Sequence, residues 1–113
     1  MSSDLPIAGW KDQLLLILRR RSAFVIDGDS MLPGLTSGDK VVVDPTVSTA
    51  AGDIVLALHP YKQNSRLIKR IAEITASGDY FLTGDNPAES TDSRTFGPLQ
   101  PDNILGKVVC RIK

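Results

Sequence analysis

The sequence predicts an all-β domain preceded by one short helix, and three observations lead to this prediction. The chain has 113 residues, 42% of them apolar, which suits one domain with a single modest core. Short apolar runs follow one another at intervals marked by Gly-Asp, Ser-Gly-Asp and Pro-Gly turn signals. Apolar residues at helical spacing occur near the N-terminus, before these runs begin.

The predicted helix covers residues 10–20. Its apolar stripe consists of Trp10, Leu14, Ile17 and Leu18. Three consecutive arginines follow at positions 19–21. Residues 1–21 are therefore expected to form a lead-in whose helix either packs on the domain or lies on a membrane surface, where basic side chains favour binding.

Residues 22–113 are expected to form the domain itself. The predicted strands are Ala23–Ile26, Lys40–Asp44, Ile54–Leu58, Leu67–Ile74, Tyr80–Thr83 and Ile104–Ile112. Residues 84–103 are rich in Gly, Pro, Asn, Asp and Ser, and we expect a long loop without regular structure there. Loops of that length in small domains are often functional.

Composition excludes several classes of protein. The 13 basic and 13 acidic residues balance, so nothing indicates a nucleic-acid binder. The single cysteine, Cys110, lies in an apolar run and is expected to be a buried hydrophobe; a chain with one cysteine has no internal disulfide. No apolar run reaches the length of a membrane span, and no signal peptide is evident. We therefore expect a cytoplasmic protein, in contact with a membrane at most peripherally.

The first candidate for chemistry is Ser30, in the run Gly-Asp-Ser-Met-Leu-Pro. Gly28 permits a positive φ, and Pro33 stiffens the chain after the serine. We expect this turn to expose Ser30 and to direct its backbone N–H toward a developing oxyanion. A serine hydroxyl also needs a base to become a nucleophile.

Two residues can be that base. His59, the only histidine, precedes a proline at a strand end, and a Ser-His-Asp triad with Asp29, Asp85 or Asp92 stays open. Lys69 is the better candidate because it lies inside an otherwise apolar strand, where desolvation lowers the pKa of an ammonium group. Strand alternation places Lys69 and Arg70 on opposite faces, so one can face the site while the other braces it.

The third candidate is the run from Gly84 to Arg94. It is rich in Asp, Asn and Ser, which form self-capping turns. A calcium loop is an alternative, but the Asp-x-Asp-x-Asp-Gly pattern and the distal glutamate are missing.

Together these three stretches resemble the type I signal peptidase family. In that family Ser-Met-x-Pro carries the nucleophile, a Lys-Arg pair carries the base and a structural arginine, and a Gly-Asp-Asn…Ser-x-Asp-Ser-Arg box closes the site. All three occur here in that order. The resemblance implies the signal peptidase/LexA-like β fold and a serine endopeptidase with Ser30 as nucleophile and Lys69 as general base.

The resemblance also assigns supporting roles. Ser90 would orient the lysine, and Met31 and Pro33 would contact the substrate. Members of the bacterial branch have a serine two residues before the nucleophile as an oxyanion donor, whereas this chain has Gly28 there, as organellar members do. The oxyanion would then rely on backbone N–H groups, chiefly that of Ser30. The box and its ion pairs would be held by Asp85, Asn86, Asp92, Arg94 and Arg70.

Within this family, the sequence resembles the maturation proteases of nickel-type superoxide dismutase more closely than it resembles the bacterial signal peptidases. The likeness covers the arginine-rich lead-in, the His-Pro at 59–60 and the run from Gly84 to Pro98. It implies that the partner is a nickel superoxide dismutase precursor that loses an N-terminal propeptide. The nickel belongs to that substrate, and no metal or cofactor is expected in this chain, which has one His and one Cys.

Three alternatives stay open. A conventional signal peptidase would act on exported preproteins and dock on a partner membrane protein through residues 10–21. A LexA-like regulatory domain would cleave itself, for example at Ala8-Gly9, although such domains lack the Gly-Asp-Asn box. A non-catalytic β module would keep the fold as a binding platform.

Overall fold

The structure, a computed structural model, describes residues 5–7, 9–11 and 21–112. Most of the helix expected over residues 10–20 lies outside these ranges. The described chain contains a six-stranded sheet whose neighbouring strands are all antiparallel, and this confirms the all-β fold class. No helix in the described ranges is long and apolar enough to cross a membrane.

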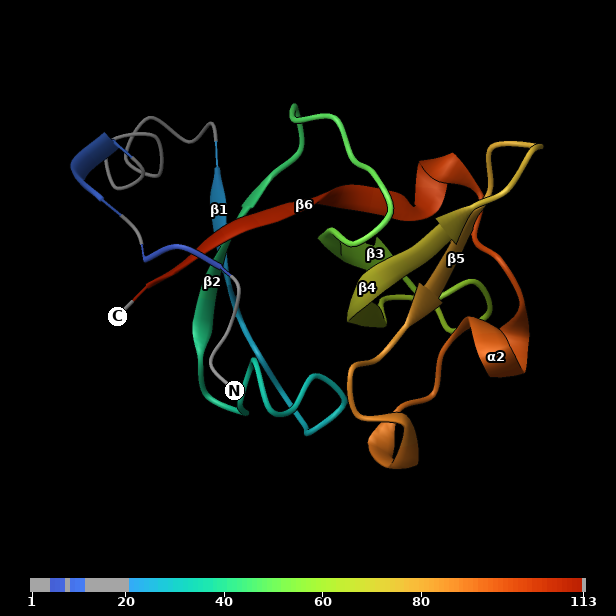
Figure 1. Cartoon of the computed structure of the whole chain (residues 1–113), viewed down its shortest axis with the longest axis horizontal. Helices are drawn as coiled ribbons and strands as arrows, with labels where there is room; N and C mark the ends of the chain where they lie inside the picture. The colour runs from blue at the N-terminus through green and yellow to red at the C-terminus, as the bar shows by residue number, and fades with distance from the viewer. Residues whose placement is uncertain (1–4, 8, 12–20, 113) are drawn as a thin grey trace.

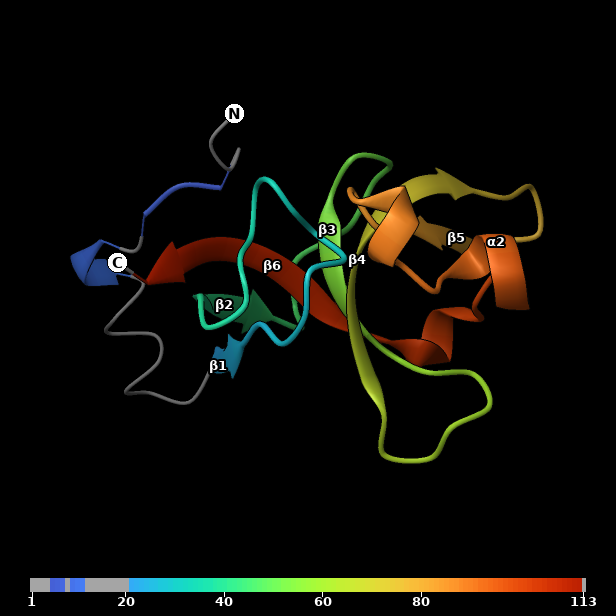
Figure 2. The same cartoon turned by 90° about the horizontal axis from the view of Figure 1, so that it is seen from below.

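The strands follow the order β1-β2-β6-β3-β4-β5 across the sheet. Their bounds are Ser22–Val25 (β1), Lys40–Asp44 (β2), Ile54–Leu58 (β3), Arg66–Ile74 (β4), Tyr80–Thr83 (β5) and Ile104–Ile112 (β6). Strand β6 runs across the molecule and joins its two halves, because it pairs with β2 on one side and with β3 on the other (Figures 1 and 2). The predicted strand at 23–26 begins one residue earlier, and β4 includes Arg66.

Two apolar clusters fill the interior. The first consists of Ile26, Met31, Leu35, Val41, Val43, Ile54, Leu56, Ile68 and Val108. The second consists of Val55, Ala57, Ile71, Leu82 and Leu99, with Tyr80, Phe96 and Ile104 packed against it. Strand β4 contributes Ile68 to the first cluster and Ile71 to the second, so its two faces serve both halves of the core.

The segment 84–103 was predicted to lack regular structure, and this prediction is wrong. It contains the 3-10 turns Pro87–Glu89 (η1) and Pro101–Asn103 (η2) and the short helix Ser93–Phe96 (α2). Prolines begin both 3-10 turns, and the Asp92 side chain caps α2 by accepting a hydrogen bond from the Arg94 amide. Leu99 also pairs with Tyr80 and is buried, so the segment is fastened to β5 at its far end.

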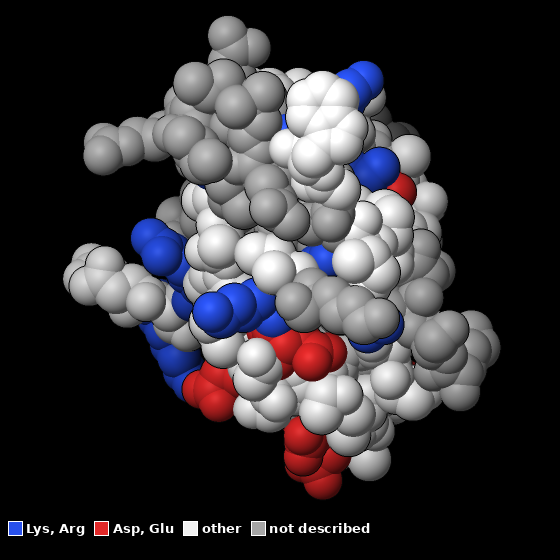
Figure 3. All heavy atoms as spheres, turned by 90° about the vertical axis from the view of Figure 1, so that its left-hand side faces the viewer, with Lys and Arg blue, Asp and Glu red and all other residues white. Residues whose placement is uncertain are grey.

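On the face that looks toward the left of Figure 1, the charged side chains of the described residues are of both signs and lie close together (Figure 3). One ion pair of the sheet is largely buried: Arg21 Nε donates to Asp44 Oδ2 at 2.9 Å, and Thr46 donates to the other oxygen. Cys110 is buried in β6, as predicted for a small hydrophobe.

Candidate active site

Ser30 lies in the loop between β1 and β2, and the core fixes that loop at several points. Met31 and Leu35 are each 1% exposed, and burying such a side chain contributes roughly 2 kcal/mol. The Ile26 amide donates to the Asp39 carbonyl at 2.8 Å and closes the base of the loop. Gly28 has a φ of 90°, which only glycine adopts without strain. Ser30 itself is half-buried rather than exposed, because Met31 beside it enters the core.

The carbonyl of Ser30 accepts a hydrogen bond, whereas its N–H donates none within the described residues. Its carbonyl accepts a hydrogen bond from the Asn86 amide at 2.8 Å, and the Asn86 side chain donates to the Asp29 carbonyl at 3.0 Å. The Ser30 N–H donates to no group in the described part of the chain. The Gly28 N–H, by contrast, already donates to Ser37 Oγ at 3.3 Å. The Ser30 N–H is thus the amide of this pair that is available to an oxyanion.

Lys69 lies in β4 opposite Val55 and is only 5% exposed. Its Nζ donates a hydrogen bond to Ser90 Oγ at 2.9 Å. Burial disfavours the charged ammonium and lowers the pKa of Lys69 from its ordinary value of 10.5. The nearby carboxylate of Asp92 acts in the opposite direction, and the guanidinium of Arg94 again lowers this pKa.

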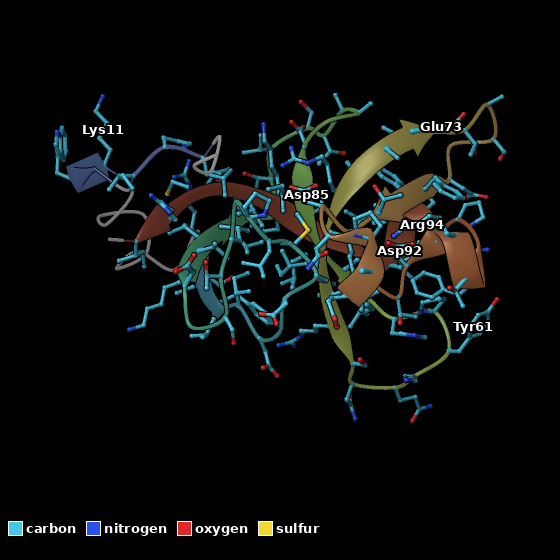
Figure 4. All side chains as sticks on the ribbon, turned by 60° about the horizontal axis from the view of Figure 1, so that its bottom comes forward. Lys11, Tyr61, Glu73, Asp85, Asp92 and Arg94 are labelled. Carbon is cyan, nitrogen blue, oxygen red and sulfur yellow. The ribbon has the colours of Figure 1, made fainter. Side chains whose placement is uncertain are left out.

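The carboxylate of Asp92 connects several residues of the box through hydrogen bonds. It is 1% exposed, and its carboxylate accepts hydrogen bonds from Ser90 Oγ at 2.7 Å and from the Gly84 amide at 2.8 Å. Arg94 adds bonds from Nε at 2.9 Å and from Nη2 at 2.7 Å. These donors hold the pKa of Asp92 well below its usual range, despite the burial that opposes ionisation. Figure 4 shows Asp92, the N-cap of α2, close to Arg94, which belongs to that helix.

Gly84 is the point where the serine loop and the box meet. A Cβ added at Gly84 would collide with Ser90 Oγ, would lie 2.5 Å from Ser90 Cβ and would lie 2.7 Å from the Ser30 carbonyl oxygen. The absence of a side chain at Gly84 therefore lets Ser30 and Ser90 approach each other. Because Ser90 holds Lys69, the same contact brings the serine loop and the lysine strand together.

Arg70 braces the other side of the box. Its Nε and Nη2 donate to the two oxygens of Asp85, each at 2.9 Å, and its Nη1 donates to the Gly52 carbonyl at 2.7 Å. Lys69 and Arg70 therefore reach different partners, as strand alternation predicts. The bidentate pair ties the end of β5 to β4 and to the turn before β3.

The structure thus brings together the residues of the expected dyad and box. Two details differ from what the sequence led us to expect. The hydroxyl of Ser30 and the Nζ of Lys69 make no hydrogen bond with each other in the described structure, and Lys69 bonds to Ser90 instead. Pro33 is exposed and does not line the pocket beside Ser30, whereas Met31 does. The catalytic roles of these residues stay predictions.

Beside Ser30 lies a pocket of about 380 Å³. Its lining residues are Phe24, Ile26, Asp27, Ser30, Met31, Asn64, Arg66 and Ile68. The sequence did not single out Phe24, Asn64, Arg66 or Ile68. Alternation along β4 could have indicated that Arg66 and Ile68 share a face, but only the folded sheet places that face beside Ser30.

His59 takes part in a local turn after β3. Its Nδ1 accepts hydrogen bonds from the amides of Tyr61 at 3.0 Å and Lys62 at 3.1 Å, and its ring packs against Phe96 at 5.0 Å between centroids. Partial burial, and to a lesser extent Lys62, lowers the pKa of His59. His59 therefore caps the turn after β3, and no bond connects it to Ser30.

Among the described residues, no three His, Cys, Asp or Glu side chains gather to hold an ion. The carboxylates of Asp85 and Asp92, the acids considered for a calcium loop, are instead engaged by Arg70 and Arg94.

Comparison with known proteins adds a family and several relatives. Residues 10–109 match the sequence profile of the family described as Peptidase S24-like. Mitochondrial inner membrane protease subunit 1 of Schizosaccharomyces pombe is 32% identical over 108 residues, covering 75% of this chain and 69% of that protein. The human subunit 1 is 30% identical over 108 residues, with 75% and 65% covered. Subunit 1a of the mitochondrial ATP-independent inner membrane protease of Arabidopsis thaliana is 28% identical over 113 residues, with 77% and 67% covered.

The chain spans about two thirds of the length of these relatives. They support the resemblance to signal-peptidase-like proteases at the level of the family. They are mitochondrial protease subunits and not maturation proteases of nickel superoxide dismutase, so they do not support that finer likeness.

Proposed function

This chain belongs to the Peptidase S24-like family, and from that premise we propose that it is a serine endopeptidase of the signal-peptidase type. Ser30 is the nucleophile and Lys69 the general base. The observation that carries the proposal is the burial of Lys69 in β4, where its pKa is lowered while Ser90 and Asp92 fix its position. A lysine that loses its proton more easily is what a serine hydroxyl needs as its base.

In the first step, the neutral amine of Lys69 removes the proton from Ser30 Oγ as that oxygen attacks the scissile carbonyl carbon. The amine must first approach the serine, since its bond in the free protein is to Ser90. Catalytic hydrogen bonds often form only when substrate is bound. The protonated lysine then gives the proton to the leaving amine, and an acyl-enzyme on Ser30 remains. Water, deprotonated by Lys69, releases the acid and restores Ser30.

The oxyanion of the tetrahedral intermediate is stabilised by the Ser30 N–H, which has no other acceptor in the described structure. Asn86 supports this geometry, because it holds the carbonyls of both Ser30 and Asp29. These bonds fix the peptide plane before the reaction begins, so little reorganisation is needed when the charge develops.

The remaining box residues are positioning residues. Ser90 holds Lys69 Nζ, and Asp92 holds Ser90. Arg94 partly offsets the negative charge of Asp92, which would otherwise stabilise the protonated lysine more strongly. Arg70 and Asp85 fasten the start of the box to β4.

The substrate is an extended N-terminal segment of a precursor protein. The pocket beside Ser30 has Phe24, Ile26, Met31 and Ile68 in its lining, which suits an apolar side chain near the scissile bond. The named relatives are proteases of a mitochondrial inner membrane. They favour a leader segment of a preprotein at a membrane surface as the substrate.

A membrane contact through residues 10–21 is part of this proposal. Within that segment, the described Trp10 is 71% exposed, and Lys11 Nζ lies 5.5 Å from its ring centre. An exposed tryptophan beside basic side chains is typical of segments that lie at a membrane surface.

Nickel superoxide dismutase precursor is the second candidate substrate, favoured by the run from Gly84 to Pro98 and by the His-Pro at 59–60. Both candidates share one chemistry, the hydrolysis of a peptide bond after an N-terminal extension. They differ in the protein that carries the extension and in whether a membrane is needed.

One experiment distinguishes the two candidate substrates and the alternative functions. The purified chain is incubated with a preprotein bearing a leader, with and without lipid vesicles, and separately with a nickel superoxide dismutase precursor, and the products are read by mass spectrometry. A cut that Ser30→Ala abolishes establishes the endopeptidase and identifies its substrate class. A change of mass in the purified chain alone, also abolished by Ser30→Ala, would instead indicate a self-cleaving domain. The absence of any Ser30-dependent cut, with the fold intact, would favour a non-catalytic module.

A further inference from the structure

The pocket beside Ser30 carries two opposite charges that have no partner within the described residues. Asp27 and Arg66 both line it, yet neither makes an ion pair or a side-chain hydrogen bond in that part of the chain. Both residues are exposed, and the apolar part of the lining comes from Phe24, Ile26, Met31 and Ile68. A ligand in this pocket would therefore meet an acidic and a basic group at different places.

Arg66 is placed to contact a chain that lies along β4. It begins this strand, where the chain returns from the loop after β3 (Figure 2), and Ile68 follows two residues later on the same lining. Side chains two residues apart on a strand share a face and are separated by about 6.6 Å. An extended peptide has the same repeat, so a side chain over Ile68 places the next side chain of that face at Arg66.

A second pocket adjoins at Arg66. It has a volume of about 310 Å³, and Phe24 and Arg66 line both pockets. Arg66 thus borders two pockets, and a carboxylate has room to approach it from either one. The acid-binding capacity of a guanidinium is high, since it presents a fork of donors that matches a carboxylate.

We infer that Arg66 makes this protein select substrates with an acidic side chain two residues from the side chain that fills the apolar part of the pocket at Ile68. The inference rests on the proposed function, and it adds a specificity-determining residue outside the dyad and the box. Asp27 contributes by repelling an acidic side chain elsewhere in the pocket, which confines the preference to one position of the peptide. Because Arg66 is exposed, we expect the preference to be about two- to fivefold in affinity.

The test uses the Ser30→Ala protein and binding rather than cleavage. Fluorescein-labelled decapeptides of Ala, Val and Ser carry Asp, Asn or Lys at one position at a time, and fluorescence anisotropy gives each dissociation constant. We expect one position at which Asp binds about two- to fivefold more tightly than Asn. Arg66→Gln should remove this difference, Arg66→Glu should turn it into a preference for Lys, and 0.5 M salt should weaken it.

Two matched variants control for general electrostatics. Lys11→Gln removes the same charge at the opposite end of the molecule from Asp92 (Figure 4) and should keep the preference for Asp. Asp27→Asn removes the other charge of the same pocket and should keep or increase the preference for Asp. Thermal unfolding of each variant shows whether the fold is intact.

The inference is overturned if Asp and Asn peptides bind equally at every position, if no peptide binds, or if the preference survives in Arg66→Gln. Incubating the same peptides with the protein that retains Ser30 tests the proposed function separately. Charge-selective binding without Ser30-dependent cleavage would refute the endopeptidase and leave Arg66 as a binding determinant. Ser30-dependent cleavage without charge selectivity would refute the role of Arg66 and leave the endopeptidase in place.

Discussion

Lys69 Nζ donates a hydrogen bond to Ser90 Oγ at 2.9 Å, and Ser90 in turn donates to Asp92 at 2.7 Å. This chain of bonds links the proposed base to the most deeply buried carboxylate of the box. It fixes where the amine lies when no substrate is present.

Ser90→Ala removes the hydroxyl that holds the lysine. Since a small misplacement of a catalytic group can be costly, we expect kcat to fall by about tenfold to a hundredfold with little change in KM. Steady-state cleavage of the substrate identified above provides the measurement. A loss confined to KM would mean that Ser90 binds substrate instead of positioning Lys69.

Arg94→Gln removes the cation that offsets Asp92. The carboxylate then stabilises the protonated ammonium more strongly, so the pKa of Lys69 should rise. Activity should fall at neutral pH and recover at higher pH, and Arg94→Lys should retain more of the original profile. A pH profile of kcat/KM for the three proteins provides the measurement. Activity that is lost equally at all pH values would assign Arg94 a purely structural role.

Lys69→Met should abolish cleavage while stabilising the fold. The pKa of Lys69 is lowered in the folded state, so the unfolded state binds more protons and the stability of the natural protein decreases as the pH falls below about 10.5. Methionine has no charge to desolvate, so its advantage should grow over the same range. Thermal unfolding at pH 10 and pH 7 should show a larger gain in Tm at pH 7. An equal gain at both values would argue against a perturbed lysine.

His59→Ala should keep most of the activity and lose roughly 1 kcal/mol of stability, because the amides of Tyr61 and Lys62 lose their acceptor. His59→Asn should recover part of this loss, since its side-chain oxygen can cap the same turn. Protonation of His59 also removes the acceptor. Its lowered pKa therefore means that this stability is present above the ordinary pKa of 6.5 and is lost as the pH falls. Denaturant titration of the three proteins at pH 8 and pH 5 checks this prediction.

Local turn chemistry explains why much of the fold could be predicted from the sequence. Gly38 and Gly52 both have a φ of 95°, and each is followed by an aspartate. Asp39 accepts from the Thr36 amide and Asp53 from the Ala50 amide, both at 2.9 Å. Such turns stop one segment and start the next at fixed residues, so β2 and β3 begin where the sequence predicts.

The segment 84–103 could not be predicted in the same way because distant bonds shape it. Asp92 caps α2 and also accepts from the Gly84 amide, and Leu99 pairs with Tyr80. None of these contacts leaves a periodic pattern in the sequence. The pocket was missed for a related reason: Arg66 and Ile68 lie beside Ser30 only because β4 joins the sheet in one register.

Residues of the dyad and box could be named in advance because they resemble a family motif, whereas their geometry could not. The resemblance implied that Ser90 orients Lys69, but the sequence did not predict that the lysine would bond to Ser90 without also bonding to Ser30. It also did not predict that the side chain absent from Gly84 would leave room for Ser90 beside the Ser30 carbonyl.

The most direct test of the Ser30/Lys69 dyad is covalent labelling of Ser30 by a serine-reactive fluorophosphonate, followed by intact-mass and peptide mass spectrometry. Labelling requires a serine oxygen that a base activates, and it needs no knowledge of the natural substrate. We predict that the natural protein and His59→Ala are labelled at Ser30, and that Ser30→Ala and Lys69→Ala, both folded, are not. Labelling of Lys69→Ala at the natural rate, together with its loss in His59→Ala, would contradict the dyad.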